Sequence, residues 1–144
     1  RALLGAIRAG LVRSAHDCAE GGLAVALAES ALADAARLFG VEVALQDDLP
    51  TTALLFGEAQ SRVVVSCRPE DADALLARME KAGVPAARVG RVGAVGGDFT
   101  VMTRGATLSA PISELAEVYY DAIPRRMDGR PQEVDAALHS EVSE

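Results

Sequence analysis

The spacing of hydrophobic residues along the chain predicts four helices, over residues 2–11, 20–36, 69–82 and 112–123. In the first, the apolar side chains share one side and Arg8 lies opposite. The third is marked most clearly, because Pro69 occupies a first helical position, acidic residues fill the first turn and Gly83 follows the end. The second presents a narrow face that would let another layer of backbone come close: Leu23, Ala26, Leu27, Ser30 and Ala31.

Alternating or β-branched runs predict strands between these helices. A short strand is expected at 12–16, a half-buried one at 41–46 and a central one at 62–67, with the last two in one sheet. Further strands are joined near 96–97, and a tight turn at 104–105 leads into a third short strand of that region. Because helices and strands interleave, the predicted class is α/β, an α+β sandwich with a mixed β-sheet flanked by helices.

Composition limits the functions that this chain can have. A chain of 144 residues is long enough to bury one core, and with 3% aromatic residues and no Trp that core must consist of Ala, Val and Leu. The formal charge is −7; five acidic residues and one arginine in 128–144 account for −4, which leaves −3 for residues 1–127. Without a basic run or stacking residues, nucleic-acid binding has no support.

The two ends of the chain and its cysteines indicate the cellular compartment of the protein. We expect one domain over residues 1–127 and a disordered acidic tail over 128–144. The chain begins with Arg1 and shows neither a signal peptide nor a run of about 18 apolar residues, so we expect a cytoplasmic piece of a longer protein without a membrane partner. Cys18 and Cys67 lack metal-ligand spacing, which predicts two reduced thiols and no metal site.

Two adjacent glycines, Gly21 and Gly22, stand where the second predicted helix begins. Together they cost a helix about 2 kcal/mol relative to alanine. Asp17 and Glu20 have the spacing of a capping box, which would stabilise the same helix start. Two explanations for the glycines remain open: a neighbouring strand or helix packs on the bare backbone, or an anion such as phosphate approaches the N-terminal amides.

Polar residues beside the glycines do not form a recognisable catalytic set. His16 and Asp17 are neighbours on a predicted strand and point to opposite faces, and Ser14 is too close in sequence to make a triad with them. A hydrogen-bonded structural histidine is the ordinary role for His16, and His139 in the tail is given no role. We therefore predict no catalytic residue.

A second polar set lies in "LLFGEAQSRVVVS". Glu58, Gln60 and Arg62 alternate into a hydrophobic strand and would share one face if the strand starts early. They would form either a polar recognition surface or a Glu58–Arg62 pair at the rim of the sheet. Other arginines are interpreted as solvated surface charges: Arg88, Arg91 and Arg104.

The stretch "SAHDCAEGGLAVALAES" and, further along, "LFGEAQSRVVVS" together resemble the C-terminal domain of the synthetase subunit of phosphoribosylformylglycinamidine synthase. The likeness extends from Ala2 through "GRVG" to "ELAEVYYDAIPRRMD". It implies a fold like the C-terminal domain of aminoimidazole ribonucleotide synthetase. It also implies that this is the last domain of a carbon–nitrogen ligase of purine biosynthesis.

In the reaction that the resemblance implies, ATP and Mg²⁺ activate the amide oxygen of formylglycinamide ribonucleotide, and ammonia displaces the phosphate. The implied partners are N-terminal ATP-binding domains of the same chain, a glutaminase subunit, a small bridging subunit and a homodimer mate. ATP and metal are expected on the N-terminal domains, so this domain alone is expected to bind neither and to be inactive. Alternatives are a C-terminal domain from aminoimidazole ribonucleotide synthetase, selenophosphate synthetase or a hydrogenase maturation protein, or a non-catalytic packing domain.

Compared residue by residue, the resemblance implies that residues of the two motifs contact a ligand. It implies no catalytic role for His16. Ala59 stands where serine is common in the family. The predicted substrate- or phosphate-binding set is His16, Asp17, Gly21, Gly22, Glu58, Gln60 and Arg62, with no metal ligand.

Overall fold

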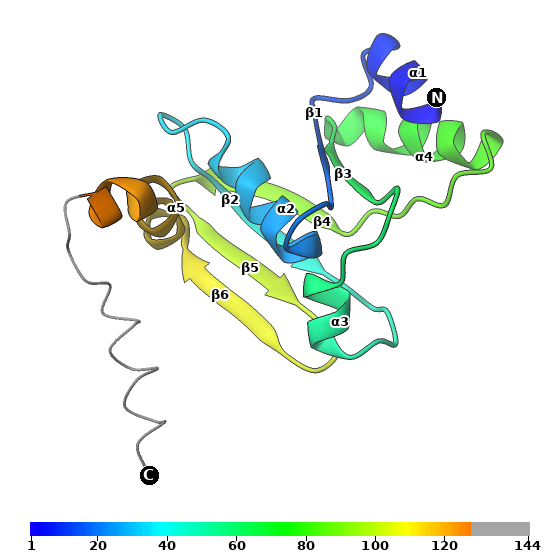
Figure 1. Cartoon of the computed structure of the whole chain (residues 1–144). Coiled ribbons are helices and arrows are strands. Elements are labelled where there is room, and N and C mark those ends of the chain that lie inside the picture. The colour runs from blue at the N-terminus through cyan, green and yellow to red at the C-terminus, as the bar shows by residue number, and fades with distance from the viewer. Residues whose placement is uncertain (128–144) are drawn as a thin grey trace.

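Two β-sheets and five α-helices make up residues 1–127, which are the part of the chain that the computed structural model describes (Figure 1). The predicted disorder of residues 128–144 lies outside the described residues. The elements in chain order are α1 (Ala2–Arg8), β1 (Ser14–Asp17), α2 (Gly22–Leu32), β2 (Phe39–Ala44), α3 (Thr51–Phe56), β3 (Val63–Ser66), a 3-10 turn η1 (Pro69–Asp71), α4 (Ala72–Lys81), β4 (Gly90–Val95), β5 (Asp98–Met102), β6 (Thr107–Pro111) and α5 (Ile112–Met127).

The larger sheet has four strands in the order β4-β2-β5-β6. Strand β2 runs antiparallel to β4 and parallel to β5, and β5 pairs antiparallel with β6, so the sheet is mixed as predicted. Along β2, Val41 and Val43 are buried while Glu42 is exposed, which gives the sheet one core-facing side. Helix α2 lies across that side, and α3 and α5 add Leu54, Leu55 and Ile112 to the same core (Figure 1).

The smaller sheet pairs β1 with β3 in antiparallel register and carries α1 and α4 beside it (Figure 1). The prediction that residues 41–46 and 62–67 share a sheet is wrong. Val64 and Val65 of β3 are half-buried on opposite faces because the strand lies between two hydrophobic clusters, while Val63 is exposed. Val64 packs against the main core, and Val65 packs against a second core of Ala6, Leu75 and Met79.

Several element boundaries differ from the predicted ones. Helix α2 spans 22–32 rather than 20–36, α1 ends at Arg8 before Gly10 takes a φ of 75°, and α3 was not predicted at all. Helix α5 continues through Pro124 instead of stopping before it. Proline removes the hydrogen bond that its N–H would have made four residues back, and its ring crowds the carbonyl there. The helix therefore continues for only three more residues, to Met127.

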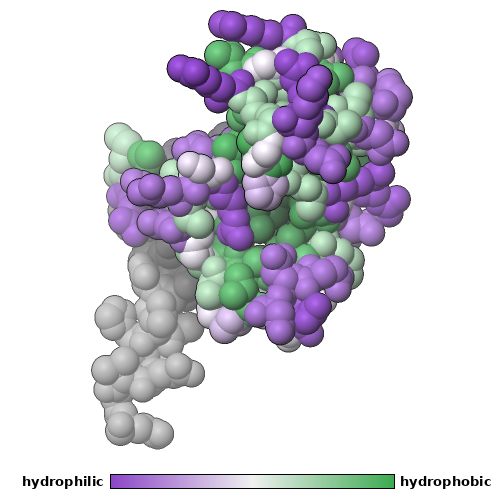
Figure 2. Space-filling model, turned by 90° about the vertical axis from the view of Figure 1, so that its right-hand side faces the viewer, coloured by the Kyte–Doolittle hydropathy of each residue, from purple (hydrophilic) through white to green (hydrophobic). Residues whose placement is uncertain are grey.

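Much hydrophobic surface stays open around these two cores. Seen from the side of α3 and α4, Figure 2 shows hydrophobic residues in the hollow between the upper and lower parts of the molecule. Helix α5 presents Val118, Ile123 and Met127, which are 66%, 71% and 81% exposed. Among the helices of residues 1–127, none has both the length and the hydrophobicity to cross a bilayer.

Candidate binding site around the double-glycine turn

The chain leaves β1 and enters α2 through Gly21 and Gly22, both in the left-handed region with φ of 77° and 70°. Glycine is the residue that adopts this conformation without steric cost. Gly21 is the N-cap of α2, and no side chain caps it. The predicted capping box is therefore wrong, because Asp17 belongs to β1 and the helix begins only at Gly22.

Gly22 is buried against the end of α3. A Cβ at this position would lie 2.7 Å from the carbonyl carbon of Phe56 and 2.9 Å from the carbonyl oxygen of Leu55. These are backbone atoms and cannot swing aside. Of the two explanations left open by the sequence, close backbone packing therefore accounts for Gly22.

Gly21 has a different partner, the carboxylate of Glu58. The Gly21 N–H donates to Glu58 Oε1 at 3.1 Å, across 37 positions of sequence. A carboxylate from the chain itself therefore occupies one of the two amides that were predicted to face an anion. The Gly22 N–H makes a longer bond of 3.4 Å to the Ala19 carbonyl.

The loop of residues 57–62 brings Glu58 to this turn. Strand β3 begins only at Val63, and Ser61 has a φ of 63°, so the predicted sharing of one strand face by Glu58, Gln60 and Arg62 is wrong. Within residues 1–127 no Glu58–Arg62 ion pair forms. Gln60 is exposed at the tip of the loop.

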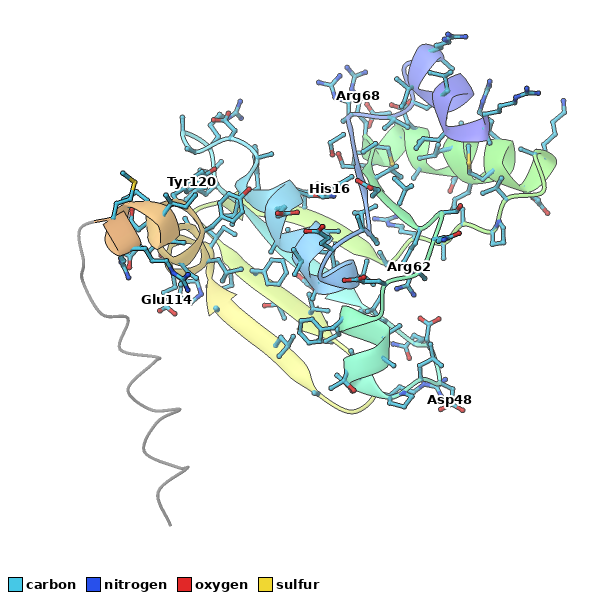
Figure 3. All side chains as sticks on the ribbon, in the orientation of Figure 1. His16, Asp48, Arg62, Arg68, Glu114 and Tyr120 are labelled. Atoms are coloured by element: carbon cyan, nitrogen blue, oxygen red, sulfur yellow. The ribbon has the colours of Figure 1, made fainter. Side chains whose placement is uncertain are left out.

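Arg62 fastens the loop to its surroundings (Figure 3). Its Nη1 donates to the Leu54 carbonyl at 3.4 Å, and its own carbonyl accepts the Cys18 N–H at 2.9 Å. Burial raises the pKa of the Cys18 thiol; the Arg62 charge acts in the opposite direction, and Asp17 adds to the rise. Cys18 is thus an inert core side chain under the turn.

His16 is half-buried beside α2 (Figure 3). Its Nε2 lies 3.1 Å from Glu29 Oε2, and its Nδ1 lies 2.7 Å from the Asp17 carbonyl oxygen. The Asp17 side chain is exposed. Sequence reasoning missed Glu29, although its position seven residues after Gly22 places it two turns along the same face of α2.

The remaining candidates lie away from the turn. Arg91 pairs with Glu42 at 2.6 Å and Arg104 with Asp48 at 3.4 Å, and these arginines are exposed as predicted, as is Arg88. Cys18 and Cys67 are both free thiols. Residues 1–127 bring no three His, Cys, Asp or Glu side chains together in a way that could hold a metal ion.

The fold and this turn define the class of protein. The sequence profile of the family described as AIR synthase related protein, C-terminal domain, matches residues 1–102, and the chain belongs to this family. Its curated relatives include phosphoribosylformylglycinamidine synthase subunit PurL of Moorella thermoacetica, 45% identical over 119 residues, which cover 82% of this chain and 16% of the relative. The PurL subunit of Allorhizobium ampelinum is 40% identical over 133 residues, 92% of this chain and 17% of the relative.

Solved structures show the same likeness. Thermotoga maritima PurL, in structures described as complexed with ATP and with FGAR, matches with a TM-score of 0.68 and 26% identity over 80% of this chain and 20% of that one. A structure described as PurLQS from the same organism matches with a TM-score of 0.64. The predicted fold class is confirmed. The chain spans only 16–17% of the length of these curated relatives.

Proposed function

We propose that this chain is the C-terminal domain of an ATP-dependent ligase that converts formylglycinamide ribonucleotide to the amidine in purine biosynthesis, in the cytoplasm. The observation that carries the proposal is 45% identity to a PurL subunit over 82% of the chain. The similarity to PurL structures described with ATP and with FGAR supports the same substrates. The PurLQS structure supports further subunits as partners, a glutaminase and a small bridging subunit, with a homodimer as another assembly.

The domain's part in that reaction is to complete a site rather than to run the chemistry. Since residues 1–127 offer no cluster of metal-binding side chains, no step is assigned through Mg²⁺ on this chain. ATP and Mg²⁺ belong on the N-terminal ATP-binding domains, where the metal would neutralise phosphate charge. The isolated domain is then inactive.

This domain is proposed to contribute one wall of the binding site. That wall consists of the turn between β1 and α2 together with the loop before β3. Asp17, Glu58 and Gln60 carry exposed polar side chains on these two segments, and Arg62 anchors the loop. An anion approaching the turn has to compete with Glu58 for the Gly21 amide. The proposed binding set is His16, Asp17, Gly21, Gly22, Glu58, Gln60 and Arg62.

A chimera tests the assignment of the domain. The matching segment of the M. thermoacetica PurL subunit is replaced by this chain, and amidine formation is measured with its partner subunits and ATP. We expect an active chimera and no turnover by the 144-residue chain alone. An inactive chimera that folds and assembles normally would refute the proposed function, and turnover by the chain alone would refute the division of labour.

A phosphate titration tests the wall itself. Removing the Glu58 carboxylate frees the Gly21 amide and removes a repelling charge, so Glu58→Ala is expected to tighten phosphate binding about tenfold. Amide chemical shifts of Gly21 and Gly22 report the binding. Glu20→Ala is the matched control, since it removes the same charge from the neighbouring segment without freeing an amide. If phosphate leaves both glycine amides unmoved in every variant, the turn serves packing only.

A further inference from the structure

Both nitrogens of the His16 ring lie within hydrogen-bond distance of an oxygen atom. Glu29 Oε2 lies 3.1 Å from Nε2, and the Asp17 carbonyl oxygen lies 2.7 Å from Nδ1. A carboxylate and a carbonyl are both acceptors, so both contacts are hydrogen bonds only when each ring nitrogen carries a proton. The two side chains are about one-third exposed, which partly shields the pair from water.

The Asp17 carbonyl is the end point of this chain of contacts. The Cys18 N–H donates to the Arg62 carbonyl, which makes residue 18 a hydrogen-bonded position of the β1–β3 ladder. Hydrogen-bonded and non-bonded positions alternate in antiparallel strands, so the backbone of Asp17 points away from β3. The His16 Nδ1–H therefore donates to the Asp17 carbonyl, which receives no hydrogen bond from β3.

Asp17 is the last residue of β1, and its side chain is exposed without a protein partner among residues 1–127. Fixing its carbonyl fixes the peptide that follows, and with it the direction of the Cα–Cβ bond on which the carboxylate is carried. Glu29 is on α2, whose first residue is Gly22, so the same helix positions both the turn and the histidine.

We propose that Glu29 and His16 are positioning residues that orient the Asp17 carboxylate toward the ligand. The proposal rests on the proposed function for the ligand itself. His16 then belongs to the proposed binding set because it acts through Asp17, without itself touching the ligand. Glu29, which no sequence motif singled out, becomes a functional residue of the site. The ligand group that fits an oriented carboxylate is a donor, such as a ribose hydroxyl or an amide N–H.

Nuclear magnetic resonance of the 144-residue chain tests the positioning step without any ligand. His139→Gln leaves His16 as the one histidine. In buffer acidic enough to protonate the imidazole, we expect both of its N–H protons to be protected from exchange. Glu29→Ala should remove the Nε2–H signal and shift the Asp17 carbonyl carbon, and Glu29→Gln, which keeps an acceptor oxygen, should restore both. Glu20→Ala is the matched control. An Asp17 carbonyl resonance unmoved by Glu29→Ala would overturn the proposal.

The active chimera tests the consequence for binding. Asp17→Asn and Glu29→Ala should each raise the KM for the ribonucleotide about tenfold with little change in kcat, and the double variant should match Asp17→Asn alone. Effects that multiply in the double variant would overturn the proposal. A normal KM for Asp17→Asn, with the resonance changes as expected, would show instead that the proposed wall does not bind this substrate.

Discussion

Gly22→Ala is the substitution whose cost the structure specifies best. Gly22 combines a φ of 70° with neighbouring backbone atoms at 2.7 and 2.9 Å from an added Cβ. The left-handed conformation costs alanine about 1–2 kcal/mol, and overpacking against atoms that cannot move costs about 1–3 kcal/mol more. The expected loss in the free energy of unfolding is therefore about 2–5 kcal/mol.

The chain contains a matched control for this prediction. Gly10 has a φ of 75° but nothing within 4 Å of an added Cβ, so Gly10→Ala should cost only the conformational part, about 1–2 kcal/mol. Urea unfolding followed by far-ultraviolet circular dichroism measures both variants, because the chain has no Trp. The reasoning fails if Gly22→Ala and Gly10→Ala differ by less than about 0.5 kcal/mol.

Three further outcomes are expected. Iodoacetamide should alkylate half-exposed Cys67 well before buried Cys18, as mass spectrometry of the two peptides would show; equal rates would contradict the packing under the turn. Burial raises the Cys18 pKa in the folded state, so the contribution of this thiol to stability is complete below about pH 8.5 and is lost as pH rises further. The urea concentration at the unfolding midpoint should therefore fall less steeply at alkaline pH in Cys18→Ala than in the unchanged chain. The Tyr120 hydroxyl donates to the Leu32 carbonyl at the end of α2, so Tyr120→Phe should cost about 0.5–1.5 kcal/mol in urea unfolding while Tyr119→Phe costs about none; equal costs would rule out this bond.

Local signals were sufficient for much of the fold. Pro69, the acids after it and Gly83 are short-range signals, and the helix they predict is present as η1 followed by α4. The Gly96–Gly97 junction and the 104–105 turn lie between the predicted strands. Helix α3 was missed because six residues are too few for periodicity, although Pro50 directly before Thr51 is a start signal that could have been used.

The candidate site could be located from the sequence but not described. The motif marks His16, Asp17 and the two glycines as one segment, and the second motif marks Glu58. That the Glu58 carboxylate rather than a capping side chain meets the Gly21 amide depends on the path of the loop, which turns at Ser61. Spacing along one strand could not predict a contact made by a loop.

The sequence by itself determined the class of fold, the family and the segments proposed to form the site, because hydrophobic period, turn residues and motif letters are local properties of the chain. Only the tertiary structure decided that β3 pairs with β1 rather than joining the larger sheet, that Gly22 is required by the backbone of α3, and that Glu29 holds His16. Each of these is a contact between residues far enough apart in sequence that no short pattern encodes it, and the packing of the two cores brings them together.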